Sequence, residues 1–136
     1  MGVIITGKYL GEKKCELRHE DSGVAIRTDA PKDNQGEGSS FSPTDLFAAS
    51  LGGCITTILG IVAWRDNVSL EGTHFRVEKE MSASPRRVGS LKVEIHLPKA
   101  IPSDYRKKLE NAGGTCPVHH SLHPDIDVEI AYHYDV

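Results

Sequence analysis

Alternating apolar and polar residues predict most of the strands in this chain. Residues 91–97 are apolar at every odd position, and residues 126–134 are apolar at every even position. A period of two is typical of a strand with one face buried and the other in water. The same reading predicts a strand over 73–81 and, earlier in the chain, a meander of three strands over 3–10, 13–18 and 23–28.

One long segment without charge predicts a helix. Residues 47–64 contain no charged side chain. Before them, Ser42 suits an N-cap, Pro43 suits the first helical position, and Asp45 suits the partner position of a capping box. We expect the helix to end near Arg65.

The same segment reaches the lower length limit of a membrane span. It contains glycine, threonine and serine, and no second apolar segment of this length follows. We therefore expect no membrane partner, but a helix that is buried on nearly all sides in a soluble protein. One small subunit cannot bury all faces of so apolar a helix. The sequence therefore predicts a dimer.

Shorter elements complete the pattern. Residues 103–112 predict an amphipathic helix, and Pro117 predicts the first turn of another. Residues 29–41 are rich in proline, glycine and serine, and predict an exposed, mobile loop. The order β-β-β-α-β-β-α-β lacks βα repeats, so the sequence predicts the α+β class. A length of 136 residues suits one domain over residues 1–136.

Charge and composition exclude some partners. The chain has 16 basic and 19 acidic residues and a net charge of −3, so we expect no nucleic-acid partner. No basic segment followed by an apolar one opens the sequence, which favours a cytoplasmic location.

Three cysteines carry the candidate chemistry. An odd number argues against a disulfide framework. Cys15 lies in a polar early strand and is taken as a bystander. Cys54 lies in the apolar helix, where reactivity requires a charged partner from elsewhere in the fold. Cys116 precedes Pro117 and suits an N-cap, where the helix dipole favours a thiolate, and His119 and His120 follow on the same turn.

Two motifs resemble those of the OsmC/Ohr family, in its OsmC-like branch. They are Phe41-Ser-Pro-Thr-Asp-Leu-Phe-Ala-Ala-Ser-Leu-Gly-Gly-Cys54 and Cys116-Pro-Val-His-His-Ser-Leu122, and weaker likeness extends over nearly the whole chain. The resemblance implies an OsmC-like fold. In that fold, antiparallel β-sheets and a long central buried helix form an intertwined homodimer.

The resemblance also implies a function in peroxide detoxification. In such a thiol peroxidase, Cys54 would attack an organic or lipid hydroperoxide and become a sulfenic acid, and Cys116 would condense with it to a disulfide. An external dithiol, often a lipoylated protein in this family, would restore the thiols. No bound cofactor or metal is implied.

The chain departs from the family at the groups that support the reactive cysteine. The family's Glu position holds Thr44, with Asp45 beside it, and the family's Arg falls near Lys13 or Lys14. We take Asp45 and Lys13 as candidate supporting residues. For Asp45 the helix cap is an equally good explanation. Lysine cannot make the planar, bidentate contact that arginine makes with a carboxylate.

Three alternatives stay open. Cys116, His119, His120 and His123 could bind a metal, although a structural zinc site needs four well-spaced ligands. The fold could bind a small apolar ligand at the dimer interface without catalysis, in which case the thiols would react slowly. The thiol pair could instead act as a redox sensor for a partner protein.

Overall fold

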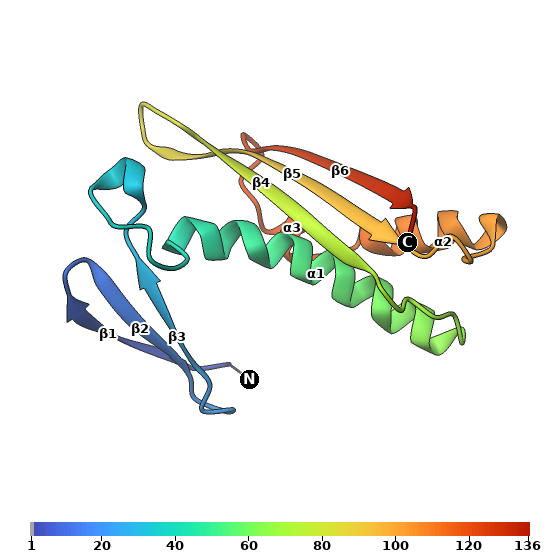
Figure 1. The fold of residues 1–136 in the computed structure, drawn as a ribbon, viewed down its shortest axis with the longest axis horizontal. Helices are drawn as coiled ribbons and strands as arrows, with labels where there is room; N and C mark the ends of the chain where they lie inside the picture. Colours follow the sequence, from blue (N-terminus) through green and yellow to red (C-terminus); the bar gives the residue numbers. More distant parts are fainter. Residues whose placement is uncertain (1) are drawn as a thin grey trace. The chain divides into compact units, whose positions relative to one another are not determined.

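The computed structural model describes residues 2–136, which form two compact units that meet in sequence at Leu46 and Phe47. The element order is three strands, a short 3-10 helix, a long helix, two strands, two helices and a last strand (Figure 1). This order confirms the predicted α+β class.

The N-terminal unit contains an antiparallel meander. Strands β1 (Ile5–Gly11), β2 (Lys14–His19) and β3 (Ala25–Asp29) pair in sequence order, as predicted. Most of their side chains are exposed, and Thr28 and Asp29 at the end of β3 are the buried ones. The chain continues through η1 (Lys32–Asn34), a 3-10 turn within the predicted loop. Asp29 itself was expected in that exposed loop, and this was wrong because its carboxylate binds Ser39 across the loop.

The long helix α1 (Pro43–Arg65) begins as the sequence predicts. The Asp45 amide donates to Ser42 Oγ (3.0 Å), and the Ser42 amide donates to Asp45 Oδ2 (2.8 Å). This is a capping box with an aspartate partner. After the helix, Asn67 adopts a left-handed conformation (φ 57°), and the Val68 amide bonds back to the Ala63 carbonyl (2.8 Å).

Only one stripe of α1 is buried within the chain. The expectation of a helix buried on nearly all sides is therefore wrong for a single chain, because one sheet covers one face and Trp64 on another face is 83% exposed. By length and composition α1 could cross a membrane, and one third of its most apolar window is buried. The buried stripe follows helical spacing and comprises Ala48, Leu51, Gly52, Ile55, Leu59 and Ala63.

The second sheet lies in the C-terminal unit. Strands β4 (His74–Ser82) and β5 (Arg87–Leu97) are antiparallel, but β5 and β6 (Asp127–Tyr134) are parallel. The family resemblance implied antiparallel sheets, and this one pair departs from it. The reason is the crossover through α2 (Ser103–Gly113) and α3 (Pro117–His120), which returns the chain to the end where β5 starts.

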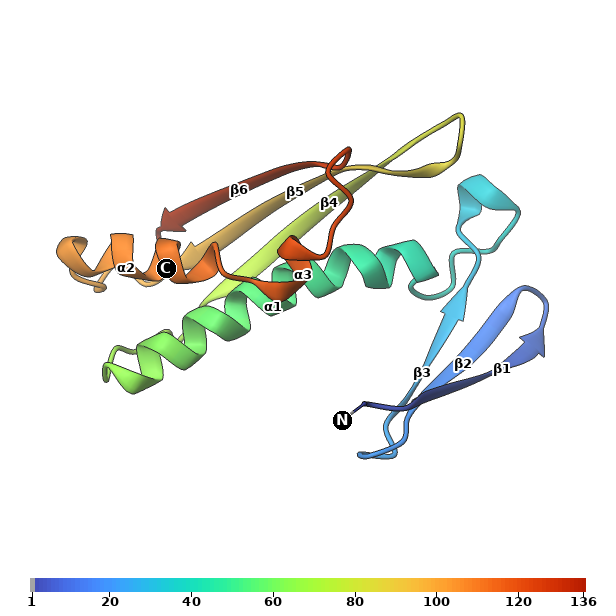
Figure 2. The same cartoon turned by 180° about the vertical axis from the view of Figure 1, so that it is seen from behind.

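The core of this unit lies between the sheet and its helices. Figures 1 and 2 show α1, α2 and α3 on the same side of the sheet. The side chains of Leu91, Val93, Ile95 and Leu97 are buried toward them. The residues between these positions point to the opposite, outer face of the sheet. The predicted half-buried strand over 91–97 is thus confirmed.

Candidate functional site

The structure brings two of the three cysteines together in the C-terminal unit. Cys54 lies on α1 and is half-buried, whereas Cys116 is fully buried at the start of α3. Both are free thiols, and they lie close enough for Cys54 to raise the pKa of Cys116. Residues that are far apart in sequence therefore form one thiol pair. Cys15 lies in the N-terminal unit, on β2 opposite Tyr9 and Thr28.

The start of α3 fixes Cys116 in place. Cys116 is the N-cap of this single helical turn, and Pro117 occupies the first position as expected. Its Sγ accepts a hydrogen bond from the His119 amide (3.4 Å), and its own amide donates to the Gly113 carbonyl at the end of α2 (3.3 Å). The short link between α2 and α3 thus sets the position of the thiol.

Burial opposes ionisation of Cys116. Desolvation raises the pKa of its thiol, and the neighbouring Cys54 side chain raises it further, while the His119 amide acts in the opposite direction. The direction of this shift runs against the expectation that the helix start favours a Cys116 thiolate, because burial outweighs the amide contact.

The ring nitrogens of His120 and His123 bond to backbone groups. His120 Nε2 contacts the Gly114 carbonyl (3.2 Å), and His123 Nδ1 accepts from the Asp125 amide (3.0 Å). The rings of His119 and His120 are 6.4 Å apart and tilted by 44°. Among residues 2–136, no group of three or more His, Cys, Asp or Glu side chains is arranged to hold a metal ion. The alternative of a Cys/His metal site has no support from this geometry.

Tyr132 is a site residue that the sequence did not reveal. Its hydroxyl packs so closely on Gly113 that a Cβ there would overlap it. Burial raises the pKa of Tyr132 most, followed by the charge of Glu110 and by the nearby Cys116. The alternation in β6 could have placed Tyr132 on the inner face. Its approach to the cysteine depends on how β6 packs on the end of α2.

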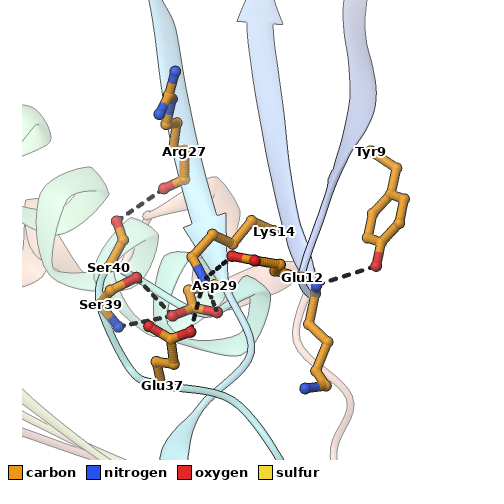
Figure 3. Close-up of polar contacts among 9 residues, drawn as sticks. Tyr9, Glu12, Lys14, Arg27, Asp29, Glu37, Ser39 and Ser40 are labelled. Atoms are coloured by element: carbon orange, nitrogen blue, oxygen red, sulfur yellow. Dashed lines mark hydrogen bonds and ion pairs between the residues drawn. The ribbon is translucent and has the colours of Figure 1, made fainter.

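The second lysine at the family's Arg position lies among carboxylates in the N-terminal unit (Figure 3). Lys14 Nζ is 3.4 Å from Glu37, 3.8 Å from Asp29 and 4.0 Å from Glu12. Asp29 is buried and accepts from the Ser39 amide (2.9 Å) and hydroxyl (2.6 Å). These contacts anchor the loop after β3 to the end of the meander.

Comparison with known proteins gives the family. The sequence model of OsmC-like proteins matches residues 36–131. This chain belongs to the OsmC-like protein family. A crystal structure from Psychrobacter arcticus 273-4, described as a candidate osmotic stress induced and detoxification response protein, is 40% identical with a TM-score of 0.91. The match covers 98% of both chains.

More distant structures share the fold of this OsmC-like protein. An organic hydroperoxide resistance protein OsmC from Legionella pneumophila is 21% identical, with a TM-score of 0.73 over 98% of this chain and 97% of that one. There is also a relative known by its sequence. An uncharacterized protein of Acinetobacter baylyi is 26% identical over 125 residues, which is 90% of this chain and 87% of that protein.

The two supporting candidates of the OsmC-like protein lie in the N-terminal unit. Lys13 is exposed in the turn between β1 and β2, where its amide donates to the Tyr9 hydroxyl (3.1 Å). Asp45 caps α1 through Ser42, so the structural role considered for it is present. Both thiols belong to the C-terminal unit. Support of the thiol chemistry by Lys13 and Asp45 stays a prediction.

Proposed function

We propose that this OsmC-like protein is a thiol-dependent peroxidase that reduces organic and lipid hydroperoxides. The observation that carries the proposal is that two free thiols, Cys54 and Cys116, are neighbours in the fold. Two such thiols within reach of each other can pass from dithiol to disulfide in one turnover. The hydroperoxide resistance relatives point to the same substrate class.

The unequal burial of the two thiols supports different roles for them. Cys54 is half-buried and can meet a peroxide, while Cys116 is fully buried. The Cys54 thiolate attacks the terminal oxygen of ROOH, the O–O bond breaks, and the products are Cys54 sulfenic acid and the alcohol ROH after protonation. Cys116 then attacks the sulfenic sulfur, and the disulfide forms with release of water.

Reduction requires an outside partner. An external dithiol reduces the disulfide by thiol–disulfide exchange and leaves as its own disulfide, so no resident cofactor is needed. A lipoylated protein is the reductant that the family favours. Such a cycle suits the reducing cytoplasm, where regenerating dithiols are maintained.

The surroundings of Cys54 favour an organic substrate. Leu51 and Ile55 are buried on the same helix, and Ile58 lies one turn further along. Phe47 is partly exposed near the helix start. Such apolar neighbours would favour the alkyl group of an organic hydroperoxide over hydrogen peroxide.

We also propose that the functional form is a homodimer. Each unit exposes large apolar side chains, among them Ile5 and Ile26 in the meander and Ile61 and Trp64 on α1. Large apolar side chains exposed in such numbers are typical of surfaces that bind a partner. A second copy would cover it. In the proposed peroxidase a cation such as Lys13 would stabilise the Cys54 thiolate, and a carboxylate such as Asp45 would hold that cation.

The test is thiol loss after mixing reduced protein with cumene hydroperoxide. Wild type should lose two thiols quickly and give a Cys54–Cys116 disulfide on peptide mapping. Cys54→Ser should show no fast phase, while Cys116→Ser should lose one thiol and accumulate sulfenic acid or overoxidised Cys54. Cys15→Ser is the matched control and should behave as wild type.

Thiols that survive a large excess of peroxide would contradict the proposal. In that case binding of a small apolar ligand without catalysis becomes the better interpretation. A fast disulfide without turnover by any dithiol would favour a redox sensor.

A further inference from the structure

Gly113, the last residue of α2, lies where three segments of the C-terminal unit meet. A Cβ at this position would overlap the Tyr132 hydroxyl from β6 and would lie 3.4 Å from Tyr132 Cζ. The same Cβ would lie 3.3 Å from Ile55 Cγ2 on α1. Gly113 is buried, and so is Ile55, which follows Cys54 in the chain. The lack of a side chain at Gly113 therefore lets β6 and α1 approach the end of α2 closely.

The position of Cys116 depends on this point. The Cys116 amide donates to the Gly113 carbonyl (3.3 Å), and only Gly114 and Thr115 separate the two residues. A link this short has little slack. Cys116 is also fully buried, so tightly packed neighbours leave its thiol few other positions. A shift of Gly113 should therefore move the Cys116 thiol with it.

Tyr132 makes a contact that the next tyrosine of β6 does not make. Tyr134 lies two residues further along, on the same face of the strand, and its hydroxyl donates to Glu110 (2.9 Å). The Tyr132 hydroxyl instead packs on Gly113. Burial raises the pKa of Tyr132 most, followed by Glu110 and Cys116, which agrees with a phenol that lies near the thiol. The two tyrosines thus offer one contact at the link and one away from it.

We propose that Tyr132 is a positioning residue for Cys116, which it holds beside Cys54 through its contact with Gly113. The inference rests on the proposed peroxidase, in which Cys116 Sγ attacks the sulfenic sulfur of Cys54. The S–S bond forms, the S–O bond breaks, and the hydroxyl group leaves as water with the proton of the Cys116 thiol. The earlier attack of Cys54 on the peroxide does not involve Cys116, so it should not depend on Tyr132.

The proposal is tested by exchanging space between positions 113 and 132. Gly113→Ala places a Cβ where the Tyr132 hydroxyl lies, and should slow disulfide formation about 100-fold, since a misplacement of about 1 Å can have an effect of that size. Without this contact, alanine would favour the helix. Tyr132→Phe leaves the space empty, and should slow disulfide formation by a smaller factor.

The double variant Gly113→Ala/Tyr132→Phe should recover much of the lost rate. Its new Cβ takes the place of the missing hydroxyl, and shifts of a few tenths of an ångström relieve the remaining contacts of 3.3 and 3.4 Å. Because the two positions touch, their effects should not add. We expect disulfide formation at least about tenfold faster than in Gly113→Ala.

Rapid mixing with cumene hydroperoxide, followed by acid quenching and mass spectrometry, separates the two steps. The amount of Cys54 sulfenic acid measures the first step, and the Cys54–Cys116 disulfide measures the second. Only the second should change in the variants. All proteins carry Cys15→Ser, which removes the third thiol.

Two matched controls make the same substitutions beside the contact. A Cβ at Gly114 would lie 3.3 Å from the Asn111 carbonyl oxygen and would not meet Tyr132. Gly114→Ala and Tyr134→Phe should therefore form the disulfide within about twofold of the wild-type rate. Circular dichroism checks that each variant is folded.

The equilibrium between the Cys54–Cys116 disulfide and dithiothreitol gives a second measurement, which needs no peroxidase activity. The disulfide is first formed with diamide, an oxidant of thiols. Gly113→Ala should be reduced at a lower dithiothreitol concentration than wild type, because its thiols are held less well together. The double variant should return toward wild type.

A double variant that forms the disulfide no faster than Gly113→Ala would overturn the proposal, as would wild-type behaviour of Gly113→Ala in both measurements. If Gly113→Ala does not fold, equal rates in Tyr132→Phe and Tyr134→Phe would overturn it. Failure of Cys54 to react with peroxide in wild type would instead contradict the peroxidase. The dithiothreitol equilibrium would then still decide whether Tyr132 positions Cys116.

Discussion

The two three-stranded sheets use similar sequence patterns but reach different degrees of burial. In the second sheet, β5 buries one face completely, with Leu91 and Ile95 in the core under the helices. In the first sheet, Ile5 is 66% exposed and Ile26 is 46% exposed. Both regions contain apolar residues in strands, so the pattern predicts a strand in each case. Whether that strand contributes to a core depends on what covers it.

The first sheet is fixed at one end by polar contacts. Its buried positions are Thr28 and Asp29, where Ser39 and Lys14 meet the Asp29 carboxylate. The second sheet is stabilised mainly by apolar burial over the length of β5. Mutations should therefore affect the two sheets differently.

The largest difference should follow truncation of an apolar side chain in each sheet. Leu91→Ala should lower the free energy of unfolding by about 2–5 kcal/mol, because it removes buried methyl groups and leaves a cavity. Ile26→Ala should change it by less than about 0.5 kcal/mol at concentrations where the chain is monomeric. Urea denaturation measures both values.

Protein concentration makes this comparison sharper. If a second copy covers the first sheet, Ile26→Ala should destabilise the protein more at high concentration than at low concentration. Equal costs for Ile26→Ala and Leu91→Ala at low concentration would contradict the difference between the sheets.

The next largest difference in stability should lie between alanine substitutions at two adjacent glycines of α1. A Cβ at Gly52 would lie 2.5 Å from the Phe75 ring and 2.8 Å from Val77, so Gly52→Ala adds overpacking of about 1–3 kcal/mol. Gly53 has no atom within 4 Å of such a Cβ, and Gly53→Ala should gain about 1 kcal/mol in helix propensity. Thermal unfolding should show opposite signs. Stabilisation by both changes would mean that Gly52 does not touch β4.

The helix cap should have a smaller effect. Ser42→Ala removes the hydroxyl that accepts from the Asp45 amide, and should cost about 0.5–2 kcal/mol. Ser42→Thr keeps an acceptor and should recover most of this loss. Urea denaturation of the three proteins provides the comparison, and equal stability of Ser42→Ala and wild type would contradict the role of the cap.

The smallest effect should be on how the free energy of unfolding changes with pH, through Asp29 and Ser39. The Ser39 hydroxyl, followed by its amide, lowers the pKa of Asp29 below its ordinary value. A depressed carboxyl pKa adds stability above the unfolded value of about 3.9, and this stability is lost as the pH falls through the folded value. The stability difference between wild type and Ser39→Ala should therefore shrink below about pH 4. A difference that stays constant from pH 6 to pH 3 would contradict this role of Ser39.

Local signals account for most of what could be predicted from the sequence. The capping box at Ser42 and Asp45, the ends of α1 and the alternation of β5 depend on residues a few positions apart. The N-cap position of Cys116 was equally local. The resemblance of two cysteine motifs added the family, which the comparisons confirm.

The burial of Cys116 could not be predicted in the same way. Its position before Pro117 favours a thiolate, whereas its burial depends on side chains from distant elements. The stacking of three histidine rings across β4, β5 and β6 was missed for a related reason. Nothing local in the sequence shows that His74, His96 and His133 share one register. The parallel pairing of β5 and β6 also follows from the path of the chain through α2 and α3.

The sequence by itself determined the secondary structure, the helix caps and the family, because each depends on short-range patterns of side chains. Only the tertiary structure decided which face of α1 is buried, which thiol is fully buried and which histidines lie side by side. Those properties depend on desolvation and on contacts between residues far apart in the chain, and both arise only when the sheet packs against the helices.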